Sequence, residues 1–146
     1  MDAFLKAINA LFKTGDGVPG SLYTAVEGRM FLNEAPANST LPTKYLVVTL
    51  DRGDRIRSMG QAANEAGRRV PFIISAYVNE THGSLTAAQI GDLIEALYDM
   101  AQLTSACFPS NTWKCRGCVE IGNPVLRHEH PYDVWAAKFQ AWLDKA

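Results

Sequence analysis

Apolar positions recur along this chain with two different periods, which predict separate helices and strands. Over residues 3–13 they follow the 3.6-residue spacing of a single helical stripe. Residues 87–102 show the same spacing, after a capping box that begins at Thr86. The stripe of this second helix is Ile90, Leu93, Ile94, Leu97 and Ala101. We expect Leu93 and Leu97 to lie buried between this helix and a sheet.

Runs rich in β-branched and aromatic residues predict the strands. The three clearest runs are residues 29–32, 44–51 and 70–79. Residues 115–126 form a fourth run, which a Gly-Asn-Pro triplet at 122–124 breaks. Residues 134–143 fit both periods, because Trp135 and Phe139 share one face of a strand and also one stripe of a helix. The pattern leaves both structures open, and residue propensities favour the helix.

A long insert, Arg52 to Arg69, separates two of the predicted strands and exceeds the usual length of a hairpin turn. It holds five of the chain's eight arginines, which are Arg52, Arg55, Arg57, Arg68 and Arg69. Asp54 and Glu65 are its acidic residues, so the insert carries a net charge of +3 while the whole chain carries −1. The planar guanidinium group forms paired hydrogen bonds with carboxylates at interfaces. We predict a mobile loop that orders against a neighbouring subunit or a partner; the alternative is a solvated connector.

Composition and charge limit the class of protein. The 146 residues have the length of one domain, and 47% hydrophobic with 20% charged residues is typical of a globular chain. The net charge of −1 provides no general attraction for a phosphate backbone, so we expect no sequence-specific nucleic-acid partner. No apolar run reaches the roughly 20 residues of a transmembrane helix, and Met1–Lys6 lacks the basic start of a signal peptide. We therefore expect no membrane partner and no export.

The sharpest candidate for chemistry is Cys115 with Cys118, followed by His128 and His130. Zn²⁺ binds four sulfur and nitrogen ligands, so this set could form a small zinc-binding module. The two histidines are too close for the usual ligand spacing, and a second cysteine pair is missing. Two buried thiols beside a polar turn explain the same residues, and a redox dithiol is a further alternative. We expect no metal site and no cofactor.

Motifs of the common enzyme classes are absent from the sequence. There is no Gly-x-Ser-x-Gly elbow, no phosphate-binding loop and no dinucleotide-binding glycine pattern. We therefore expect that the chain is not an enzyme and has no catalytic residues.

The order of the predicted elements resembles the tail terminator proteins of long-tailed phages, also called tail-completion or head–tail joining proteins. The N-terminal helix is followed by Gly28-Arg29-Met30-Phe31, then by Glu34-Ala35-Pro36, and Leu41-Pro42 precedes the next strand. The last predicted strand begins near Trp135, after an acidic turn, as in that family. The resemblance covers nearly the whole chain at the level of element order.

The resemblance implies an α+β fold for residues 1–146, as a single tail-terminator-like domain. A mixed or antiparallel sheet of about five strands would carry two helices on one face, in the order α-β-β-β-α-β-β. Residues 134–143 would then be a strand, and we expect the sheet edge at Val134–Leu143 to contribute to contacts between subunits.

The same resemblance implies a structural role in virion assembly. Family members form rings, typically hexameric, that cap the tail tube, end its polymerisation and help to join the tail to the head. The implied partners are further copies of this chain, the tail tube protein and a head-completion or connector protein. The implied location is the head–tail junction of the virion, after assembly in the host cytoplasm.

Overall fold

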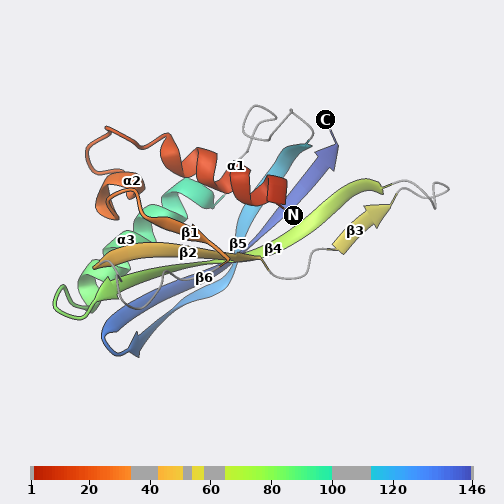
Figure 1. Cartoon of the computed structure of the whole chain (residues 1–146). Coiled ribbons are helices and arrows are strands. Elements are labelled where there is room, and N and C mark those ends of the chain that lie inside the picture. The colour runs from red at the N-terminus through yellow and green to blue at the C-terminus, as the bar shows by residue number, and fades with distance from the viewer. Residues whose placement is uncertain (1, 34–42, 51–53, 58–64, 100–112, 146) are drawn as a thin grey trace.

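The computed structural model describes residues 2–33, 43–50, 54–57, 65–99 and 113–145. Helices cover one face of a mixed six-stranded sheet (Figure 1), so the expected α+β class is confirmed. The helices are α1 (Asp2–Lys13), α2 (Leu22–Ala25) and α3 (Ser84–Tyr98). The strands are β1 (Met30–Leu32), β2 (Lys44–Leu50), β3 (Asp54–Arg57), β4 (Glu65–Asn79), β5 (Trp113–Glu129) and β6 (Tyr132–Lys145). None of these helices combines the length and the apolar character needed to cross a membrane.

The long strand β4 organises the sheet. The strand order is β1-β2-β4-β6-β5, with β1 parallel to β2 and the other neighbours antiparallel. On one side, β4 pairs with β6 from Gly67 opposite Asp144 to Asn79 opposite Tyr132. On its other side, β2 pairs with the second half of β4, and β3 pairs with the first residues of β4. The hydrogen-bonding edge of β4 that faces away from β6 is thus shared by β2 and β3, which follow one another in sequence.

Residues 134–143 form a strand, as the resemblance implies and against their helix propensity. The alternate residues of β6 are buried under the helices: Trp135, Ala137, Phe139, Ala141 and Leu143. Burial of every second residue requires an extended strand, and β6 is extended because β4 and β5 supply backbone hydrogen-bonding partners on both of its sides. The strand therefore lies inside the sheet, and the expectation that Val134–Leu143 is an edge is wrong.

The insert at 52–69 is not one long loop. β3 takes up Asp54–Arg57, and β4 begins at Glu65 instead of Val70. The strand starts earlier because β6 continues as far as Lys145 and offers ladder partners to residues 67–69. Residues 52, 53 and 58–64 lie outside the described part of the chain.

The predicted break at 122–124 is a bulge within the continuous strand β5. The pairing with β6 moves from Ile121 opposite Lys138 to Val125 opposite Ala136. Three residues of β5 thus face a single residue of β6. Gly122 adopts a φ of 71°, which favours glycine, and Pro124 has no N–H to donate to a ladder.

Helix α3 begins earlier than the capping box predicts. Its N-cap is Gly83, and Thr86 lies inside the helix, where its hydroxyl donates to the carbonyl of His82 at 2.9 Å. Ile90, Ile94 and Tyr98 are buried among the core residues. Leu93 and Leu97 are only half-buried, because they line a cleft of about 340 Å³ shared with α1 and α2. The buried face of α3 is therefore centred on Ile90, Ile94 and Tyr98 and not on Leu93 and Leu97. The helix ends at Tyr98, before the predicted end at residue 102.

The core joins α1 and α3 to the centre of the sheet. Phe4 on α1 packs edge-to-face on Phe72 with 5.1 Å between ring centroids, and Phe72 stacks on Phe139 at 5.4 Å. The buried Tyr98 hydroxyl donates to the carbonyl of Ile8 at 2.9 Å. Burial raises the pKa of Tyr98, so the phenol remains a hydrogen-bond donor. The amphipathic helix predicted over residues 3–13 is confirmed.

Gly91 marks the closest approach of α3 to the sheet. Within a helix, glycine is less favourable than alanine by about 1 kcal/mol. The indole of Trp135 on β6 lies directly against Gly91, and a Cβ at this position would overlap the ring. Trp135 is only 5% exposed, so the ring has little room to move away. The missing side chain therefore sets the spacing between α3 and β6.

Gly91→Ala should lower the free energy of unfolding. Overpacking typically costs about 1–3 kcal/mol, which outweighs the gain of about 1 kcal/mol in helix propensity. Denaturant titration of the variant measures the change. Ala96→Gly, at an exposed position of the same helix, is the control for propensity alone. A Gly91→Ala protein more stable than the wild type would contradict the close packing on Trp135.

A contact between α3 and β5 brings carboxyl groups together. Asp99, the C-cap of α3, accepts the backbone N–H of Glu120 through Oδ1 at 2.9 Å. Burial, a hydrogen bond with Glu95 and the charges of Glu95 and Asp99 together raise the pKa of Glu120 to about 7. Glu120 therefore holds a proton in the folded protein at pH values where the unfolded chain has lost it.

Stability should decrease as the pH rises towards neutrality. The pKa of Glu120 is about 7 in the folded protein and about 4.3 in the unfolded chain. Its contribution to the free energy of unfolding is therefore complete below about pH 4.3 and is lost as the pH rises through about 7. Glu120→Gln stays neutral, so its thermal unfolding midpoint should fall less than that of the wild type between about pH 5 and about pH 8. The control is Glu129→Gln, an exposed position of the same strand. Identical pH profiles for Glu120→Gln and the wild type would refute this assignment.

Candidate functional site

The arginine-rich insert forms an arm at one end of the sheet. We use the name arginine arm for β3 together with residues 65–69 of β4. Figure 1 shows β3 at the end of the sheet that lies away from α2 and α3. Four of the five arginines of interest lie on this arm: Arg55, Arg57, Arg68 and Arg69. Arg52 lies outside the described residues.

The register of the arm places charges opposite one another. Asp54 is opposite Arg69, and Arg57 is opposite Glu65. Arg55 is opposite Arg68, and like charges in directly opposed positions destabilise a ladder. Within the described part of the chain, β3 pairs with β4 alone, so the arm has a strand edge. The sequence of the arm contains four arginines against two acidic residues, Asp54 and Glu65.

A second surface lies on the helix-free face beside β5, and sequence reasoning missed it. We call it the β5 patch: Ile121, Val125 and the half-buried Ile73. Ile121 is 39% exposed and Val125 is 56% exposed, on either side of the bulge. A cleft of about 230 Å³ lies between Ile73 and Val125 and reaches Lys138. Because the pairing of β5 with β6 exposes these apolar residues, the strand pattern alone gives no sign of the patch.

The four residues of the possible zinc module do not come together, so that alternative is wrong. Cys115 and Cys118 are buried in the core, both on the helix-covered side because a bulge follows Cys115. Cys118 is opposite Ala141, whereas His128 is opposite Asp133, so about 26 Å of strand separates the thiols from the histidines. Burial also raises the pKa of the Cys118 thiol, which keeps it protonated and a poor ligand or redox group.

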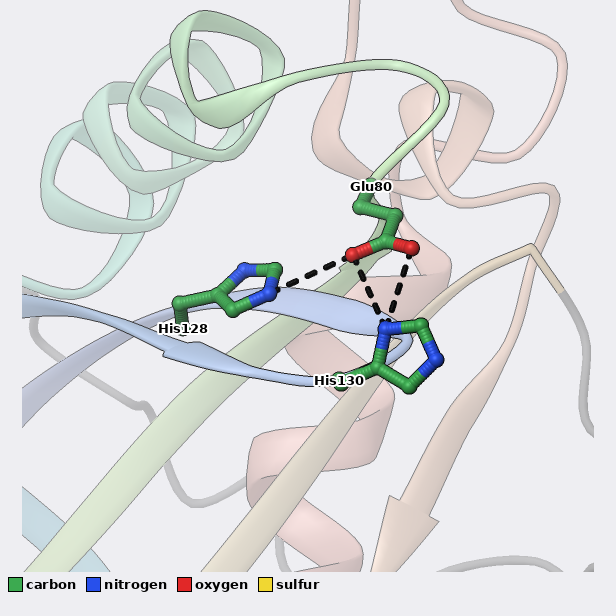
Figure 2. A group of neighbouring side chains, drawn as sticks. All are labelled: Glu80, His128 and His130. Carbon is green, nitrogen blue, oxygen red and sulfur yellow. Dashed lines mark hydrogen bonds and ion pairs between the residues drawn. The ribbon is translucent and has the colours of Figure 1, made fainter.

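The two histidines instead lie beside Glu80, as Figure 2 shows. His128 Nε2 is 3.3 Å from Glu80 Oε2, and His130 Nδ1 is 3.1 Å from Glu80 Oε1. On its other side, His128 Nδ1 is 2.9 Å from Asp133 Oδ1. The hydrogen bond with Asp133 raises the pKa of His128, and the charges of Asp133 and Glu80 contribute to this rise. Glu80 follows β4 and is far from the histidines in sequence, so spacing rules do not detect it.

Comparison with known proteins identifies the fold. No protein-family model matches the chain, and no curated protein matches it. Among solved structures, a chain of the "Virion of native gene transfer agent (GTA) particle" is 16% identical and aligns over 94% of each chain with a TM-score of 0.64. A second structure, of a protein without a functional name, is 15% identical over 96% of this chain and 94% of that one, with a TM-score of 0.57. At these identities the likeness shows a common fold.

Proposed function

We propose that this chain is a structural protein of a phage-type virion and acts as a tail terminator. In this role, copies of the chain form a ring that caps the tail tube, ends its polymerisation and helps to join the tail to the head. The observation that carries the proposal is the fold shared, over 94% of both chains, with a component of the gene transfer agent virion. The element order of the sequence supports the same role independently.

Two different surfaces support assembly into a ring. Closed rings with head-to-tail contacts need one surface of each subunit to meet a different surface of the next. The arginine arm and the β5 patch are such a pair, because β3 and β5 lie on opposite sides of the β4–β6 pair in the strand order. The arm offers charge and an open strand edge, while the patch offers exposed apolar side chains. We assign both surfaces to contacts between subunits or with the tube.

The proposed location and partners follow from this role. The chain would lie at the head–tail junction of the virion, between the tail tube protein and a head-completion or connector protein. Residues 1–146 would act as one domain, and binding between proteins, without catalysis, would be its function. The arginines of the arm, together with Arg52 that precedes it in sequence, would meet carboxylates on the neighbouring protein, since paired hydrogen bonds make arginine specific for such groups.

Charge reversal on the arm separates assembly from folding. Arg55→Glu places a carboxylate opposite Arg68, so the isolated subunit should keep or slightly increase its stability. The same change should weaken ring formation, because it removes one of the charges that meet an acidic partner. We expect the wild type to form rings of six by native mass spectrometry, and to bind the ends of tail tubes in electron micrographs. Arg55→Glu should do both more weakly.

Lys13→Glu gives the same change of net charge on α1 and serves as the control. It should leave ring formation and tube binding close to the wild type. A wild-type protein that stays monomeric at every concentration and ignores tube ends would overturn the proposed function. If rings form but Arg55→Glu assembles as well as the wild type, the arm has no part in assembly.

Val125→Asp tests the β5 patch in the same assays. Val125 is 56% exposed, so the substitution should change the free energy of unfolding by about 0.5 kcal/mol or less. A buried carboxylate at the centre of an apolar contact is costly, so ring formation should be strongly reduced. Val18→Asp, at a residue 50% exposed in the segment between α1 and α2, is the matched control. Equal assembly by both variants would remove the β5 patch from the proposed interface.

A further inference from the structure

Glu80, His128 and His130 come together from two separate segments of the chain. Glu80 follows β4 in the turn before α3, whereas His128 lies near the end of β5 and His130 in the turn between β5 and β6. The backbone N–H of Glu80 donates to the carbonyl of Pro131 at 2.9 Å, which joins the two turns directly. The pairing of Asn79 with Tyr132 fixes the strand ends on which both turns rest. The cluster therefore has a rigid base even though its side chains are exposed.

The distances within the cluster match those between the ligands of a metal ion. Around a tetrahedral Zn²⁺, ligand atoms at about 2.1 Å from the ion lie about 3.4 Å from one another. A single oxygen of Glu80, Oε2, lies 3.3 Å from His128 Nε2 and 3.2 Å from His130 Nδ1. All three ligand atoms lie within 4.8 Å of one another. Binding of an ion would require the exposed His130 ring to turn until the two histidine nitrogens are about 3.4 Å apart.

Asp133 determines which nitrogen of His128 faces the cluster. Its Oδ1 is 2.9 Å from Nδ1, so the neutral ring carries its proton on Nδ1 and donates it to Asp133. The lone pair of Nε2 then faces the Glu80 carboxylate at 3.3 Å, where either a second proton on the ring or a metal ion between the two atoms makes the contact favourable. A carboxylate behind a ligating histidine is the usual partner in protein zinc sites, where it fixes the ring and makes it more basic.

We propose that Glu80, His128 and His130 bind one Zn²⁺ ion, with Asp133 as the residue that positions His128. Two imidazoles and one carboxylate are a ligand set that zinc accepts, and the fourth position is open to water. The ion links the β4–α3 turn to the β5–β6 turn. The carboxylates of Glu80 and Asp133 balance its charge. This site differs from the zinc module considered from the sequence, because it uses His128 and His130 with Glu80 and without Cys115 and Cys118.

Calorimetric titration of the full chain with Zn²⁺ alone tests the site. We expect one ion per chain, with the affinity at least 10-fold lower in both Glu80→Gln and His130→Ala. Asp133→Asn should reduce the affinity by about 10–100-fold, because loss of a partner behind the ligand has that effect in other zinc proteins. Co²⁺ in place of zinc should give the absorption bands of a tetrahedral site, and these should weaken in His130→Ala.

His82→Ala is the matched control, since His82 is an exposed histidine of the β4–α3 turn that lies outside the cluster. It should bind zinc as the wild type does. A folded wild-type chain that binds no zinc would overturn the proposal, as would unchanged affinity in Glu80→Gln or an equal loss in His82→Ala. The measurement does not depend on ring formation, so its outcome is separate from that of the proposed function.

Discussion

The antiparallel ladder between β4 and β6 is the constraint on which the rest of the structure depends. Side chains alternate between the faces of a sheet, so the pairing of Ala76 with Trp135 assigns a face to every residue of both strands. A slip of one residue would move Phe139 and its neighbours out of the helix-covered core. The contact between Trp135 and Gly91 then fixes how closely α3 can approach that face. The helical layer therefore takes its position from the register of two strands.

The same ladder determines where the candidate functional groups lie. At one end, β4 leads into Glu80, and β6 begins directly after the β5–β6 turn that contains His130. At the other end, β6 extends beyond Val70 and supports the arginine arm. The two ends are separated by about 40 Å of strand, so the proposed metal site and the arm cannot act on one small ligand together. They are separate surfaces of one sheet. Of these two, the arm belongs to the proposed assembly interface and the metal site does not.

The edges of the sheet explain why contacts between subunits are a reasonable role for this fold. Among the described residues, the short β1 and the strands β3 and β5 each pair with one neighbour, and an open strand edge must be covered, charged or bent. β3 is an arginine-bearing edge, whereas β5 is bent by the bulge at Gly122 and exposes Val125 nearby. One edge is suited to an acidic partner and the other to an apolar one. Such a difference favours head-to-tail contacts over contacts between identical surfaces.

The sequence by itself determined the helix over 3–13 and the strands near 29–32 and 44–51, because apolar spacing reports which side of an element is buried. The α+β class followed from the resemblance in element order. It could not choose between helix and strand for 134–143, and it predicted a loop over 52–69. Both depended on hydrogen-bonding partners distant in sequence, which β4 and β6 supply to each other. For the same reason, the tertiary structure alone separated Cys118 from His128 and brought Glu80 to the histidines. Spacing along a chain predicts local periodicity, whereas the meeting of side chains depends on strand register, which is set by the whole sheet.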